Sequence, residues 1–101
     1  MGITYYFNCD TCDYTAIISG GRDSGFVALV QTMTCHNCNE LVDVLIGAYG
    51  KEGKTEDAEM NKALGICPEC KRSDVVRWDD EKPCPKCDGK MIRGKEASLW
   101  D

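Results

Sequence analysis

Four apolar runs, separated by polar or glycine-rich residues, organise the first half of the chain. Residues 5–7 and 14–18 are rich in aromatic and β-branched side chains, and longer apolar runs cover residues 26–34 and 41–46. This composition over these lengths predicts β-strands. Residues 19–25 contain three glycines and predict a turn. We therefore expect the first half to fold as short antiparallel strands.

The pattern changes beyond residue 47. Residues 48–65 are mostly polar and predict a linker, within which residues 55–64 carry a capping threonine, early acids and a following glycine, the signals of a short helix. Residues 73–78 predict one more strand. The tail, residues 92–101, is mostly polar, and we expect Trp100 to cover part of a core.

The two longer predicted strands are apolar on both faces. In residues 26–33 and 41–46 both alternating sets of positions carry apolar side chains. A sheet of two or three strands has only one core side, so its second face needs a cover. That cover is the other half of the chain, the predicted helix, a second copy in a homodimer, or another protein.

All eight cysteines belong to four Cys-x-x-Cys pairs. Two such pairs supply the four thiolates of one tetrahedral metal site, in which no coordination position stays open. The turn inside each pair, a metal knuckle, directs backbone amides toward the sulfurs and stabilises thiolate charge. The sequence therefore predicts two structural four-cysteine sites and two Zn²⁺ ions, with the ligands Cys9, Cys12, Cys35, Cys38, Cys67, Cys70, Cys84 and Cys87.

The spacing of the pairs favours sequential pairing. There are 22 residues between the first and second pairs and 13 between the third and fourth, but 28 between the second and third. We therefore assign the first two pairs to one site and the last two to the other. The alternative is a cross-braced arrangement, in which the first pair joins the third and the second joins the fourth. The predicted organisation is one zinc ribbon over 1–47, a linker over 48–65, and a second zinc ribbon with a C-terminal tail over 66–101.

The size of the chain and its first residues indicate the compartment. Modules of this size seldom bury enough apolar surface to fold alone, so the cysteines should be folding determinants. We see no secretory leader in residues 1–9, and no apolar run approaches the roughly 18 residues of a membrane span. We expect a reduced, metallated, cytoplasmic chain without membrane contact, and not a disulfide scaffold.

The charge disfavours nonspecific binding to nucleic acid. The formal net charge is −5 with neutral thiols. Each zinc tetrathiolate adds four negative charges and two positive ones, which takes the metallated chain to about −9. Residues 1–47 hold five acids and one base, whereas residues 66–101 hold eight of each. Any nucleic-acid face should therefore lie in the C-terminal half.

Two segments resemble the knuckles of small bacterial zinc ribbons, within the broader rubredoxin-like architecture. Residues 67–70 read Cys-Pro-Glu-Cys, and residues 84–91 read Cys-Pro-Lys-Cys-Asp-Gly-Lys-Met. They are similar to the Cys-Pro-x-Cys-Gly-Gly-x-Met pattern, with Asp88 where glycine is usual. The resemblance covers nearly the whole chain outside the linker and implies two tandem zinc ribbons of mostly β structure. It does not assign a role, because zinc ribbons serve many processes.

Rubredoxins, which hold iron in a related four-cysteine frame, provide an alternative function as electron carriers. Their knuckles are normally followed by glycine. In this chain the four knuckles are followed by Asp13, Asn39, Lys71 and Asp88. Zinc is therefore the expected metal.

Other candidate features have simpler interpretations. Residues 79–81 resemble the acidic tip of transcript-cleavage zinc ribbons, but we expect a solvated turn. The loop 20–25 could hold a phosphate with Arg22, yet it lacks the P-loop lysine and is expected to be a hairpin turn. His36 lies inside a knuckle and is expected to be a loop side chain. A base-stacking, backbone-contacting face in the second half would combine Trp78 and Trp100 with Arg72, Arg77, Lys82, Lys86, Lys90, Arg93 and Lys95.

These observations predict a cytoplasmic, non-catalytic protein with two structural zinc sites. Neither predicted metal site has an open position, and we find no arrangement of residues typical of an enzyme. The expected function is binding, to another protein or to a second copy of the chain. The alternatives are nucleic-acid or transcription-machinery binding through the second ribbon, and iron electron transfer.

Overall fold

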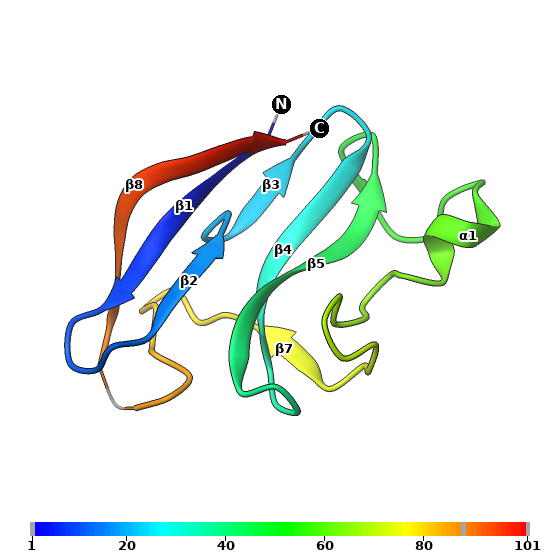
Figure 1. Cartoon of the computed structure of the whole chain (residues 1–101). Coiled ribbons are helices and arrows are strands. Elements are labelled where there is room, and N and C mark those ends of the chain that lie inside the picture. Colours follow the sequence, from blue (N-terminus) through cyan, green and yellow to red (C-terminus); the bar gives the residue numbers. More distant parts are fainter. Residues whose placement is uncertain (1, 88, 101) are drawn as a thin grey trace.

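In the computed structural model, which describes residues 2–87 and 89–100, the two ends of the chain lie side by side in one antiparallel sheet (Figure 1). Strand β1 (Gly2–Cys9) is central in this sheet, between β2 (Thr15–Ile18) and β8 (Met91–Trp100). Phe7 and Ile18 alternate with the exposed Tyr6 and Ile17. This period of two places one face of the sheet against the core.

The second sheet is built around β4 and β5, and all its pairings are antiparallel. One edge of β4 pairs with β5, and the other edge is shared by β3 and β7. Thr32 lies between these two short partners, because its N–H donates to Gly21 O and its carbonyl accepts from Trp78 N. The strands are β3 (Arg22–Ser24), β4 (Ala28–Cys35), β5 (Glu40–Ala48), β6 (Lys51–Glu52) and β7 (Val75–Arg77).

The fold is small and mostly β, as predicted, and most predicted strands coincide with observed ones. The tail is different: residues predicted as a polar extension form β8, the longest strand. It is an edge strand with two register shifts against β1, so its side chains lack a clean alternation. Trp100 pairs with Gly2, and the tryptophan in the buried core is Trp78. Asp88 and the last residue of the predicted tail lie outside the described residues.

The predicted helix is reduced to one turn, α1 (Ala58–Asn61). Its N-cap is Asp57, whose carboxylate accepts from Glu59 N and Met60 N. Thr55, the expected cap, instead hydrogen-bonds the side chain of Asn61, which fastens the loop before the helix. A helix of this length needs tertiary support. In the described part of the chain, α1 is the only helix, and it is far too short to cross a membrane.

Two buried clusters form the core. The first lies between the two sheets, where Phe7 and Trp78 meet edge to face with ring centroids 5.5 Å apart. The second joins Val42 and Val44 to cysteines. Leu41 belongs to the first cluster, so β5 buries both of its faces within the chain itself.

Strand pairing joins parts of the chain that the sequence analysis separates. β1 lies in the predicted first ribbon, yet it pairs with β8 in the predicted second. In the same way β4 pairs with β7. Each sheet therefore contains strands from both 1–47 and 66–101. The segment between them covers the free edge of β5, where Gly53 N donates to Ile46 O and Gly65 N to Leu45 O.

Candidate metal centres

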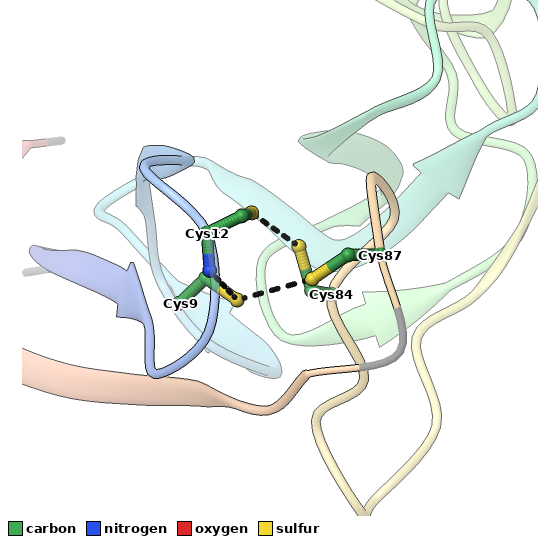
Figure 2. Close-up of side chains that lie close together, drawn as sticks. All are labelled: Cys9, Cys12, Cys84 and Cys87. Carbon is green, nitrogen blue, oxygen red and sulfur yellow. Dashed lines mark hydrogen bonds between the residues drawn. The ribbon is translucent and has the colours of Figure 1, made fainter.

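The structure brings all eight cysteines into two groups of four. The outer centre takes one knuckle after β1 and one before β8, and its four sulfurs face one another in Figure 2. The inner centre takes the knuckle between β4 and β5 and the knuckle before β7. The outer centre consists of Cys9, Cys12, Cys84 and Cys87, and the inner centre of Cys35, Cys38, Cys67 and Cys70.

The predicted sequential pairing is therefore wrong, and so is the cross-braced alternative. The pairing is nested: the first pair joins the fourth, and the second joins the third. Strand pairing decides this, because Cys9 lies opposite Met91 and Cys35 lies opposite Val75. Closing a loop of 71 residues instead of 22 costs only about 1 kcal/mol more, so loop length is a weak guide.

The distances between sulfurs fit a tetrahedral metal ion. Cys9 Sγ and Cys87 Sγ are 3.4 Å apart, and Cys12 Sγ and Cys84 Sγ are 3.7 Å apart. In the inner centre two sulfur pairs are separated by 3.6 and 4.0 Å. A tetrahedron with metal–sulfur distances of about 2.3 Å has edges of about 3.8 Å. Disulfide bonds are about 2.05 Å long, and all eight cysteines are free. Each group could therefore bind one metal ion.

Backbone amides point at the sulfurs of the outer centre. The N–H groups of Thr11 and Cys12 donate to Cys9 Sγ, both at 3.3 Å. Gly89 N donates to Cys87 Sγ at 3.2 Å. Further donors in the two centres are Lys86 N to Cys84 Sγ and Cys38 N to Cys35 Sγ. These bonds favour the thiolate form that a metal needs.

The pKa values of the thiols show how each group shares its charge. The backbone N–H of Cys12 lowers the pKa of Cys9 to about 7. Burial opposes ionisation of Cys70, but the Arg72 N–H and neighbouring sulfurs lower its pKa to about 7. The hydrogen bond with Cys70 raises the pKa of Cys38 to about 12. In the outer centre, the Gly89 N–H favours the Cys87 thiolate, but the Cys9 sulfur and burial outweigh it and raise its pKa to about 12. Four thiolates can therefore coexist only around a cation.

The position after a knuckle requires left-handed backbone in the inner centre. Asn39 has φ 56° and Lys71 has φ 64°, the region that glycine enters without steric cost. Glycine is the usual residue there in the proteins that the knuckles resemble. Asp88, the corresponding residue of the last knuckle, lies outside the described residues. Asp13 is not among the residues with positive φ.

The other candidate residues have structural roles or remain at the surface. Arg22 forms an ion pair with Glu52, and the loop 20–25 is part of the turn and strand beside β4. Residues 79–81 are exposed, and the Asp79 carboxylate accepts from Glu81 N within its own turn. His36 is exposed and belongs to neither sulfur group.

The basic residues of the second half are engaged by the first half. Trp78 is only 4% exposed, so its ring is not available to stack on a base. Lys82 Nζ lies 4.9 Å from the centroid of the Trp78 ring and donates to Gly20 O. Lys86 lies over the Tyr14 ring and Arg93 over the Tyr5 ring. These contacts fasten the two halves together.

The sequence gave no signal for one buried polar network. The Asp43 carboxylate accepts from Ser19 N and Ser19 Oγ, at 2.8 and 3.0 Å, and from Thr32 Oγ1 at 2.6 Å. Burial raises the pKa of Asp43 despite these bonds. The network ties the turn after β2 to the centre of the second sheet, so its role is structural. A charge at an apolar strand position was the only sequence feature that marked it.

The fold and the two sulfur groups together define a small, mostly β protein with two four-cysteine centres of the metal-binding type. Comparisons of the chain with protein-family models, with curated proteins and with solved structures found no match.

Proposed function

We propose that the chain is a non-catalytic zinc protein in which two structural Zn²⁺ ions hold the two sheets together. The observation that carries this proposal is that all eight cysteines lie in two closed groups with the edge lengths of a tetrahedral tetrathiolate. Zn²⁺ favours four thiolate ligands in structural sites. A site whose four positions are all taken by the protein has none left for a substrate or an activated water.

Native mass spectrometry with elemental analysis tests the metal assignment. Protein purified without added metal should carry two zinc ions per chain. Iron with visible colour would replace the proposal by the rubredoxin-like electron carrier. Absence of bound metal, with the cysteines joined in disulfides, would overturn it altogether.

We also propose that the zinc-stabilised fold binds another protein, through the open end of the β4–β5 hairpin. Phe26 and Tyr49 are 77% and 74% exposed, unusual values for large apolar side chains. They belong to the same end of the hairpin, because Tyr49 N donates to Val27 O. Beside them lies a groove of about 580 Å³ with Val27, Ala48 and Met60 in its lining. Aromatic and methionine side chains are enriched at protein interfaces.

A photo-crosslinking amino acid placed at position 26 tests this binding role. In the cells that normally make the protein, we expect protein adducts at position 26. The control is the same substitution at Ile92, which is 50% exposed on the other sheet. Adducts with a second copy would identify the homodimer, and adducts with nucleotides would support the nucleic-acid alternative. Equal labelling at both positions would contradict a binding site at the hairpin.

A further inference from the structure

The two centres close loops of different length. The inner centre spans the 28 residues between Cys38 and Cys67, and the outer centre spans the 71 residues between Cys12 and Cys84. From loop closure alone, the outer centre should form about four-fold less readily. Once the inner centre has formed, the loop closed by the outer centre shortens to 22 residues on one side and 13 on the other. This shortening favours the outer centre about three-fold.

The inner centre is also the more buried. Cys35 and Cys67 are both 0% exposed, whereas in the outer centre only Cys84 is buried, at 6%. Val42 and Val44 pack directly on the inner sulfurs. Exchange of metal with solvent should therefore be easier at the outer centre.

Strand β7 begins at the inner centre. Cys35, a ligand, lies opposite Val75 in the β4–β7 pairing. His36 N donates to Asp74 O at 2.8 Å, and Cys67 N donates to Arg72 O at 2.8 Å. A metal at the inner centre would therefore fix the start of β7 from both knuckles.

The other end of β7 leads directly to the outer centre. Trp78 follows the strand, and its backbone N–H donates to Thr32 O. Its indole Nε1–H donates to Pro83 O at 2.9 Å, and the next residue is the ligand Cys84. The ring packs in the cluster that also contains Phe7, Cys84 and Met91. Trp78 therefore positions the last knuckle.

We infer that zinc fills the two centres in order, the inner one first, and that β7 and Trp78 couple the outer centre's affinity to the occupancy of the inner one. This inference rests on the proposed zinc function. Coupling between two binding sites is reciprocal, so zinc at the outer centre strengthens the inner one by the same factor. The chain with one zinc keeps the β4–β5–β7 region ordered, while β1, β2 and β8 lose the metal that joins their knuckles.

Brief alkylation of free thiols tests the order on the unmodified chain. The metal-free protein receives one equivalent of Zn²⁺, is labelled, and is mapped by mass spectrometry. We expect protection of the four inner cysteines and labelling of the four outer ones, with all eight protected at two equivalents. Equal protection at one equivalent, or protection of the outer group first, would overturn the order. Lack of protection in excess zinc would instead refute the zinc function itself.

Variants test the coupling. Cys84→Ser should bind one zinc with the affinity of the first zinc of the unmodified chain. Cys67→Ser should bind its remaining zinc at least about three-fold more weakly than the second zinc of the unmodified chain. Equal affinities would overturn the coupling. If Cys67→Ser does not fold, Trp78→Phe provides the test, with Trp100→Phe as its control. Loss of the Trp78 indole N–H should weaken only the second zinc, and an unchanged second zinc would exclude Trp78 as the link.

Discussion

At the scale of single residues, the positions after the inner knuckles combine a left-handed backbone with side chains that resist it. Lys71 is exposed and its backbone N–H donates to Cys67 O, so the turn fixes its φ. A non-glycine residue in this region costs about 1–2 kcal/mol, less for asparagine. The metal centre holds the backbone in this conformation, and the strain is local.

Lys71→Gly should therefore stabilise the zinc-loaded protein by about 0.5–1 kcal/mol, since relief of strain exceeds the entropy that glycine adds to the unfolded chain. Denaturant unfolding in excess zinc measures the change. The matched control is Lys54→Gly, another exposed lysine, which is not among the residues with positive φ. A gain at position 54 equal to that at position 71 would contradict the explanation.

At the scale of elements, the sequence located the strands better than their partners. The long runs that became β4 and β5 were predictable because they are apolar and β-branched. β8 was not, because an edge strand with register shifts has no strict alternation. The eight cysteines were recognisable as metal ligands from their spacing alone. Their grouping was not, because it depends on which distant strands pair, and loop length changes that balance by only about 1 kcal/mol.

The approach of β8 to the first knuckle gives a prediction for one centre alone. A Cβ on Gly89 would lie 2.7 Å from Cys9 Sγ and 2.7 Å from Thr11 Oγ1. Gly89→Ala should therefore push the two outer knuckles apart, at a cost of about 1–3 kcal/mol, or roughly 5- to 150-fold in outer zinc affinity. Competition with a chelator of known affinity measures it.

The control for this change is Gly21→Ala, because nothing lies within 4 Å of the Cβ it would add. Gly21→Ala should keep both zinc affinities. Loss of the inner zinc before the outer one in Gly89→Ala would show that the clash is not confined to the outer centre.

At the scale of the whole molecule, metal binding and proton release are linked. Without a cation, Cys9 and Cys70 have pKa values of about 7, while Cys38 and Cys87 have values of about 12. Near neutral pH most of the thiols are therefore protonated, and a bound zinc must displace about three protons from each centre. Acid favours the protonated thiols and hence the metal-free chain.

Zinc affinity should therefore rise about 10³-fold per centre for each unit of pH near neutrality. Titration in a series of buffers, or calorimetry in buffers with different ionisation enthalpies, gives the number of protons released. Release of one proton or none per zinc would show that the thiols are already ionised and would contradict the assigned pKa values.

Nesting also determines what a break in the backbone would do. Every cysteine before the exposed segment 53–57 shares a centre with cysteines that follow it. A chain cut there, for example at a protease site inserted after Gly53, should remain one particle in zinc and separate into two fragments when a chelator is added. Size-exclusion chromatography measures this, and separation of the cut chain in the presence of zinc would contradict the nested pairing. The two halves are thus complementary fragments whose reassembly is conditional on metal, the behaviour of a split protein controlled by zinc.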